Sequence, residues 1–305
     1  MKQPTASAPG KIILSGEYAV VFGKRGIAIP SKESVTVTWT EDASLPGPVI
    51  DWDGGVDARW ITYVERIFGY LEPLTGKLKG KLLVQCELPL GKGMGSSTSL
   101  VIAVCRCFLG PDCREAALSI EDQINPGHSG IDFAVIFENI PILYARGKER
   151  EIPKLPNDIL KGARLIDSGR PNETTKELVA WMKSRYPTTE PTQSPLPATE
   201  QAHSPLPATE LAHSPLPAAG TSRPKAEGMN VYEAINSIGD CTERLLKGES
   251  LHTVMRDHHR AQVALGIVPD SARTIIEHIE SEGGSAKVIG AGGRTGGGGM
   301  VLVLP

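Results

Sequence analysis

The chain has 305 residues, of which 40% are hydrophobic, so it is long enough for one large domain or two of ordinary size. A formal net charge of −3 excludes the strongly basic surface typical of nucleic-acid or anionic-membrane binding, and no apolar run approaches the roughly 18 residues that span a bilayer. The surplus of glycine (33) and proline (24) is local, with nine prolines in Pro187–Pro224 and nine glycines in Gly283–Gly299, so the chain is globular with two unusual segments.

The first half of the chain is predicted to be rich in strands. Apolar runs, or alternation of apolar and polar residues, indicate strands at Ile12–Leu14, Val35–Thr40 and Leu82–Leu88. Helical spacing of apolar residues predicts helices over Ile61–Tyr70, Thr98–Leu109 and Arg114–Ile124. The apolar run Ile131–Leu143 is predicted to be extended.

The second half is predicted to be mostly helical and to end in strands. Helices are expected at Thr175–Lys183, Val231–Lys247, Leu251–Leu265 and Ser271–Ser281. Strands are expected at Ala286–Ile289 and Met300–Leu304. Because strands come first and few strand–helix–strand alternations are visible, the pattern favours an α+β fold over a doubly wound sheet.

A proline-rich repeat separates two of the later helices. The ten-residue unit Ser194–His203 recurs as Ser204–His213 and begins again at Ser214. Two prolines in each unit are incompatible with a helix or an interior strand, which predicts a semi-extended, solvated insert. A docking segment for a partner is the alternative reading, since Ser-Pro steps can serve as ligands.

The cysteines and the N-terminus indicate a cytoplasmic protein. The five cysteines are odd in number and lie in apolar surroundings, so they are interpreted as reduced thiols. Cys105, Cys107 and Cys113 fit no standard zinc spacing, and buried structural thiols are the favoured interpretation. Met1–Pro9 lacks the apolar core of a secretory signal.

The segment Pro89–Thr98 has the composition of an anion-binding turn between a strand and a helix. Gly91, Gly93 and Gly95 allow a tight turn whose N–H groups converge, and the following helix adds its positive N-terminal end. The following hydroxyl-bearing residues, Ser96, Ser97 and Thr98, can reach a phosphate-bound Mg²⁺. The spacing matches neither a Walker A loop nor a Rossmann fingerprint, and a purely structural turn is the alternative.

Three further segments gain meaning only in combination. Ala8–Gly23 contains Lys11 and Glu17, and Glu121–Asp132 has a carboxylate at each end. Lys287–Met300 is rich in glycine between two predicted strands, as expected where another backbone or a ligand comes close. Taken alone, each charged residue is equally compatible with a capping or surface role.

In this order, the four segments resemble the GHMP small-molecule kinases, and among them the mevalonate kinases. The resemblance covers nearly the whole chain outside the proline-rich insert. It is carried by these elements: Pro9–Lys11 and Gly16–Val21, Gly93–Ser97, Glu121, His128–Asp132, Thr174–Val179 and Gly290–Gly299.

The resemblance implies a fold and a reaction. The fold would have a strand-rich N-terminal ATP-binding domain (1–165) and a helix-rich α+β C-terminal domain (166–305), the latter interrupted by the insert at about 186–226. The active site would lie in the cleft between them. The reaction would be ATP-dependent phosphorylation of the primary hydroxyl of mevalonate, with no nucleic acid or membrane involved. Dimers occur in the family, so a homodimer is one possible assembly, and the sequence leaves the oligomeric state open.

The resemblance also implies roles for individual residues. Asp132 would be the general base and Lys11 would stabilise the charge that develops on phosphoryl transfer. Ser97 and Glu121 would hold Mg²⁺. ATP would bind to Gly91, Lys92, Gly93, Met94, Gly95, Ser96, Ser97 and Thr98, and the substrate to Glu17, Tyr18, Thr175, Gly290 and Ala291.

Departures from the family pattern keep other substrates open. Tyr18 stands where the family usually has a histidine, and a tyrosine at this position is found in many phosphomevalonate kinases. His128 replaces a proline of the family pattern. A phosphorylated substrate would need a cluster of cations near Asp132, for which the sequence offers scattered candidates such as Arg170 and Lys176. The last glycine segment is about four residues longer than usual, which suggests a cationic contact from Arg294. A sugar kinase and a non-catalytic ATP-binding scaffold are more distant alternatives.

Overall fold

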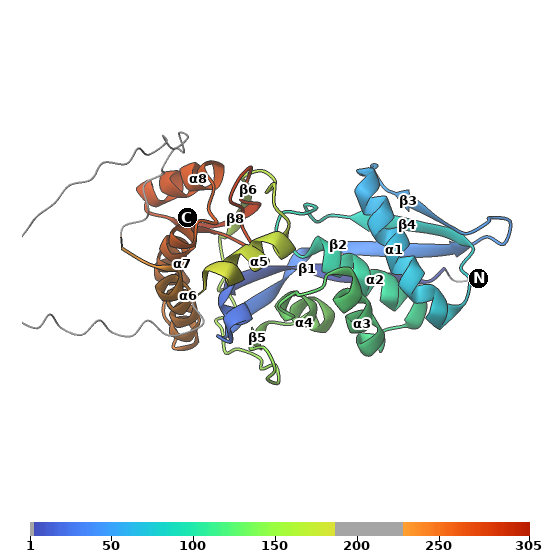
Figure 1. The fold of residues 1–305 in the computed structure, drawn as a ribbon, viewed down its shortest axis with the longest axis horizontal. Helices are drawn as coiled ribbons and strands as arrows, with labels where there is room; N and C mark the ends of the chain where they lie inside the picture. The colour runs from blue at the N-terminus through green and yellow to red at the C-terminus, as the bar shows by residue number, and fades with distance from the viewer. Residues whose placement is uncertain (1–2, 187–227) are drawn as a thin grey trace, which may run out of the picture.

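The computed structural model describes residues 3–186 and 228–305, which form an elongated molecule with two β-sheets (Figure 1). The proline-rich insert lies outside the described residues. The first sheet lies toward the end of the molecule that holds the N-terminus, and the second lies toward the end that holds the C-terminus. The α+β class predicted from the sequence is confirmed.

The first sheet has the order β1-β2-β4-β3, and a short strand, β5, also pairs with β2. Its pairs are antiparallel except for β3 and β4, which are parallel. Val35, Val37 and Trp39 are buried, as their alternation with threonines predicts. The strands are β1 (Thr5–Ser15), β2 (Gly26–Glu41), β3 (Pro48–Trp52), β4 (Gly80–Cys86) and β5 (Ile142–Tyr144).

Four helices accompany this sheet: α1 (Ala58–Thr75), α2 (Ser96–Leu109), α3 (Arg114–Ile124) and α4 (Ile131–Glu138). Helices α2 and α4 pack against β1 and β2, and α1 and α3 pack against α2. Because α2 is covered on several sides, it is apolar almost all round and its residues Leu100–Cys105 are fully buried.

The prediction of an extended segment at Ile131–Leu143 was wrong for its first part. Residues Ile131–Glu138 form helix α4, and only Ile142–Tyr144 form a strand. A continuous apolar run fits a buried helix as well as a buried strand. The left-handed residues Gly130 and Asn139 begin and end the helix, and Asn139 is a signal that the apolar run concealed.

The second sheet has the order β6-β8-β7 and consists of β6 (Arg164–Asp167), β7 (Ser285–Val288) and β8 (Met300–Leu304). It is accompanied by α5 (Thr175–Arg185), α6 (Val231–Leu246), α7 (Leu251–Leu265) and α8 (Asp270–Ser281). These helices agree closely with the predicted ones. The predicted boundary at residue 165 falls inside β6, and the division into two domains stays a prediction.

The end of β1 connects the two halves. After Ser15 the chain turns into a short 3-10 helix, η1 (Ala19–Phe22). Tyr18 and Ala19 belong to a hydrophobic cluster formed otherwise by residues of the second half, including Leu178 and Ile235. Helices α6 and α7 both contact β1. One strand of the first sheet is therefore embedded at its end in the second half.

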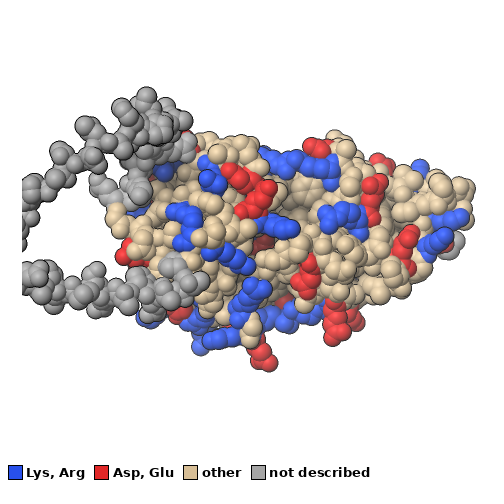
Figure 2. Space-filling view, viewed as in Figure 1, with Lys and Arg blue, Asp and Glu red and all other residues tan. Residues whose placement is uncertain are grey.

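The surface carries charges of both signs. On the face drawn in Figure 2, basic and acidic side chains are interspersed. Among the described residues, no helix is both long and apolar enough to cross a bilayer. All five cysteines are free.

Candidate active site

The glycine-rich turn before α2 has the backbone conformation of an anion-binding loop. Gly91, Gly93 and Gly95 have φ angles of 71°, 89° and 79°, a region that glycine enters without steric cost. Gly95 is the N-cap of α2, and no side chain caps the helix there. The first N–H groups of α2 are therefore left for a ligand, and the helix dipole favours an anion.

The second glycine-rich segment, Gly290–Gly299, packs directly against this turn. A Cβ atom added to Gly93 would lie 2.5 Å from the carbonyl oxygen of Ile289, and one added to Gly290 would lie 2.8 Å from Cα of Gly93. Only glycine fits such an approach of two backbones. The two glycine-rich segments singled out in the sequence thus meet in space.

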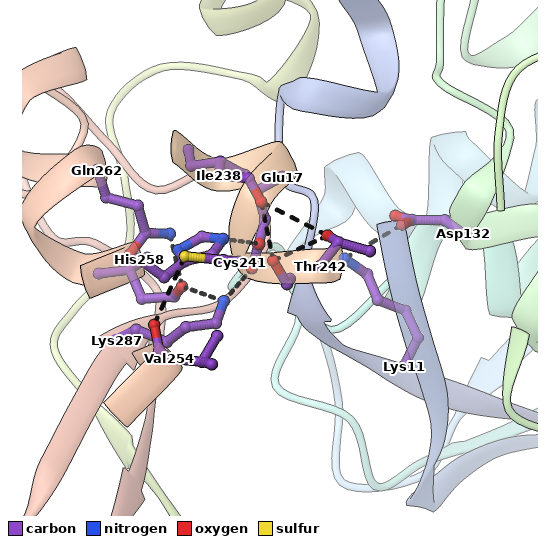
Figure 3. A network of polar contacts seen from close by, with 12 residues as sticks. Lys11, Glu17, Asp132, Ile238, Cys241, Thr242, Val254, His258, Gln262 and Lys287 are labelled. Carbon is purple, nitrogen blue, oxygen red and sulfur yellow. Dashed lines mark hydrogen bonds and ion pairs between the residues drawn. The ribbon is translucent and has the colours of Figure 1, made fainter. Parts of the chain in front are cut away.

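Lys11 and Asp132 form an ion pair beside the first glycine-rich turn (Figure 3). Lys11 Nζ lies 3.1 Å from Asp132 Oδ1, and the side chains are 3% and 35% exposed. The backbone N–H of Lys11 donates to the carbonyl of Met94, at 2.9 Å. Strand β1 supplies the lysine and the first turn of α4 supplies the aspartate. The pair therefore combines a buried cation with a carboxylate that solvent and a substrate can reach.

Glu121 lies on α3, behind the start of α2. Its Oε1 accepts a hydrogen bond of 2.8 Å from Thr98, so this hydroxyl, predicted to contact ATP, faces the protein instead. Its Oε2 is buried without a hydrogen-bond partner. Burial raises the pKa of Glu121, and the hydrogen bond from Thr98 and the nearby His128 act in the opposite direction.

A tyrosine that sequence reasoning missed lies close to this carboxylate. Tyr63, on α1, accepts a hydrogen bond of 2.8 Å from Asn125, and its hydroxyl also interacts with Ser97. Burial, reinforced by the charge of Glu121, raises the pKa of Tyr63 far above its usual range. Tyr63 had no motif around it, and only the packing of α1 against α2 and α3 brings it to the site.

Among the residues that the structure describes, no group of three or more His, Cys, Asp or Glu side chains could hold a metal ion. Ser97 and Glu121 offer two oxygen ligands, and the buried Oε2 of Glu121 has no other partner. Mg²⁺ prefers oxygen ligands and is usually held by one or two protein groups plus substrate phosphates. The donor set therefore fits Mg²⁺ bound to a nucleotide.

The predicted substrate residues are only partly brought together. Tyr18, with a φ of 61°, donates from its hydroxyl to the carbonyl of Ala291 at 2.6 Å, so both lie next to Gly290. Thr175 is exposed at the start of α5. Glu17 is fully buried and pairs with Lys287 and His258, so it presents no surface to a substrate.

The basic side chains that could contact a phosphate do not form one cluster. Lys92 pairs with Asp167, and Lys176 is exposed on α5. The guanidinium of Arg294 stacks on Trp181, 4.4 Å from the ring centroid, and the cationic contact suggested for Arg294 stays a prediction. Arg170 lies over the turn, its Nε 3.5 Å from where a Cβ of Gly91 would be.

No family model matches the sequence. The mevalonate kinase of Pyrococcus furiosus is 28% identical over 336 residues, an alignment that covers 98% of this chain and 89% of that protein. The crystal structure of Methanococcus jannaschii mevalonate kinase superposes with a TM-score of 0.70 at 18% identity, covering 100% of this chain and 91% of that one. The chain has the GHMP kinase fold and resembles mevalonate kinase.

A third comparison includes a bound substrate. The Leishmania major mevalonate kinase in complex with R-mevalonate superposes with a TM-score of 0.69 at 18% identity, covering 100% of this chain and 87% of that one. Similarity at this level shows that the fold is shared. The resemblance to mevalonate kinases inferred from the sequence motifs is thereby confirmed.

Proposed function

We propose that this chain transfers the γ-phosphoryl group of ATP to the primary hydroxyl of mevalonate and gives 5-phosphomevalonate. The observation that carries the proposal is the Lys11–Asp132 pair, 3.1 Å apart, beside a left-handed glycine turn at the N-terminus of a helix. The full-length resemblance to mevalonate kinases supports the choice of acceptor. Phosphoryl transfer needs positioning and charge neutralisation above all, and these elements supply both.

Each element has one task in this mechanism. The N–H groups at the start of α2, where no side chain caps the helix, hold the triphosphate. Asp132 accepts the proton of the substrate hydroxyl as its oxygen attacks the γ-phosphorus. Lys11, which is held against the turn by its own backbone bond to Met94, balances the negative charge on the transferring group.

Mg²⁺ belongs to the proposal through Ser97 and Glu121. When bound, the ion neutralises the charge of the phosphate oxygens. The chain contributes a hydroxyl from α2 and the buried Oε2 of Glu121, whose carboxylate is oriented by Thr98. Removal of the ion by a chelator should therefore abolish turnover and should be reversed by added Mg²⁺.

Mevalonate is favoured over phosphomevalonate by the placement of the cations. A second phosphate needs several free cations near Asp132. Lys92 and Arg294 are instead engaged by Asp167 and Trp181. Arg170 lies over Gly91. Of these three cations, two are therefore engaged elsewhere, so the three do not form a cluster of free charges beside the carboxylate.

The test is ADP release by the purified chain with ATP and Mg²⁺, in parallel with mevalonate, phosphomevalonate and galactose. The proposal expects turnover with mevalonate alone. Faster turnover with phosphomevalonate or galactose would reassign the substrate, and no turnover with any acceptor would favour a non-catalytic scaffold. A cytoplasmic location and a homodimer remain predictions, the latter to be checked by light scattering.

A further inference from the structure

The turn that follows β1 is strained and is held from several sides. Tyr18 adopts a φ of 61°, which is unfavourable for a residue with a large side chain and persists only where the surroundings impose it. Its hydroxyl donates to Ala291, in the second glycine-rich segment. Just before the turn, Ser15 Oγ donates to the carbonyl of Ile238 at 3.1 Å and accepts from Thr242 at 3.0 Å.

A buried ionic cluster also holds the turn (Figure 3). Glu17 Oε1 accepts a hydrogen bond from Lys287 Nζ, and Glu17 Oε2 lies 2.9 Å from His258 Nε2. The side chains of Glu17, Lys287 and His258 are 2%, 0% and 0% exposed. Lys287 also donates to the carbonyl of Val288, which accepts from Gln262 as well.

The cluster connects the strand that carries Lys11 to the second glycine-rich segment, Gly290–Gly299. Its carboxylate follows the strand that carries Lys11, and its lysine precedes Gly290 by three residues on β7. In Figure 3 the Lys11–Asp132 pair and the cluster of Glu17, Lys287 and His258 lie apart, and Glu17 follows the end of β1. Any displacement of Glu17 relative to Lys287 would therefore shift Lys11 relative to Gly290–Gly299, which packs on the phosphate-binding turn.

We propose that Glu17, Lys287 and His258 are positioning residues that hold Lys11 and the second glycine-rich segment in register for phosphoryl transfer. The proposal rests on the proposed kinase function. A buried ion pair is not required for stability as such, since neutral side chains of similar volume often serve equally well there. The buried contacts of Glu17 with Lys287 and His258 at a strained turn instead serve precision, and a displacement of 1 Å can reduce turnover by about 100-fold.

The test compares single and double neutral variants with a matched control. Glu17→Gln and Lys287→Met should each lower the unfolding temperature and kcat, and Glu17→Gln/Lys287→Met should recover most of the unfolding temperature. Its kcat should remain at least about tenfold below wild type, with the KM for ATP changed less than kcat. Arg25→Gln removes a half-exposed pair with Glu243 that also joins the two halves, and it should leave kcat unchanged.

Two further measurements keep the outcome decisive. Tyr18→Phe removes only the hydroxyl bond to Ala291 and should lower kcat several-fold with little change in unfolding temperature. Hydrogen exchange should be faster in Gly290–Gly299 of the double variant than in wild type, whatever the acceptor. A double variant with wild-type kcat and wild-type exchange overturns the positioning role. Absence of kinase activity in wild type overturns the proposed function, and exchange then still tests the cluster.

Discussion

Two lysine–carboxylate pairs involve β1 or the turn that follows it, and they differ mainly in their access to water. In Lys11–Asp132 the carboxylate is 35% exposed, whereas in Lys287–Glu17 both side chains are sealed. An open carboxylate can exchange a proton with a substrate, while a sealed one can only hold its partners in place. The same two residue types therefore perform chemistry in one region and fix geometry in the other.

The largest effect is expected at the open pair. Asp132→Asn keeps the shape of the side chain but removes the proton acceptor, so kcat should fall by about 10²–10⁴-fold while ATP binding is retained. Steady-state turnover and nucleotide titration measure the two quantities. Asp158→Asn, an exposed aspartate outside the site, is the control. Near-wild-type turnover of Asp132→Asn would remove the general base from the mechanism.

Replacement of the lysine by methionine should lower the free energy of unfolding by different amounts in the two pairs. Lys287→Met leaves Glu17 buried without its cation and should lower the free energy of unfolding by about 3–5 kcal/mol. Lys11→Met leaves Asp132 partly in water and should cost about 1 kcal/mol or less in stability, although it abolishes most of the activity. Denaturant unfolding of the two variants gives the comparison. Equal losses would contradict the distinction between a sealed and an open pair.

The buried histidines His258 and His259 should also make the free energy of unfolding depend on pH. Burial, with Arg273 nearby, lowers the pKa of His259 to about 4, and burial likewise lowers the pKa of His258. A lowered histidine pKa contributes stability above the unfolded value near 6.5, and that contribution is lost as the pH falls from there toward 4. Between pH 7.5 and 5 the free energy of unfolding should fall by about 2 kcal/mol on account of His259.

His259→Gln cannot take up this proton, so its stability should depend less on pH by about the same 2 kcal/mol. Chemical denaturation at the two pH values measures the difference. Glu17 does not contribute in this window. Burial alone would raise its pKa, but Lys287 and His258 outweigh that effect and lower it to about 2, so its contribution is lost only between about pH 4.5 and 2. An unchanged pH dependence in His259→Gln would place the titrating group elsewhere.

The smallest effect is expected from the proline-rich insert, which lies outside both regions. Deletion of Ser194–Ala218 should leave kcat and the unfolding temperature nearly unchanged if the repeat is a solvated tether. The ring centroids of Phe22 and Tyr186 are 4.0 Å apart, and those of Tyr186 and Tyr232 are 5.7 Å apart. Tyr186 precedes the insert and Tyr232 follows it, so aromatic contacts already join its two flanks. A large loss of activity would instead support a working role for the repeat.

Sequence reasoning was most successful where a motif is local. The turn Gly91–Gly95 could be interpreted from neighbouring residues, because its conformation depends on glycine and on the helix that follows. The structure brings Lys11 next to Asp132 across 121 positions of sequence, a proximity that the family resemblance implied and that residue spacing alone could not.

The sequence could not reveal which acidic side chains are buried. Glu17 was expected to contact substrate, but its partner Lys287 is 270 residues away in the chain, and only the packing of α7 against both β1 and β7 buries the two together. Tyr63 was missed for the same reason. Burial depends on contacts between distant segments, so residue types and spacing carry little information about it.

Strand β1 connects Lys11 rigidly to the turn that contains Glu17. Register irregularities interrupt its pairing with β2 on both sides of Lys11, and beyond them the strand is clamped at Ser15 and Glu17. Ser15 is four residue steps after Lys11, a distance of about 13 Å along the strand, so a tilt of about 5° at the clamp displaces Lys11 by roughly 1 Å. Substitutions at Ser15 or Glu17 would thus displace the catalytic lysine without any change to the lysine itself.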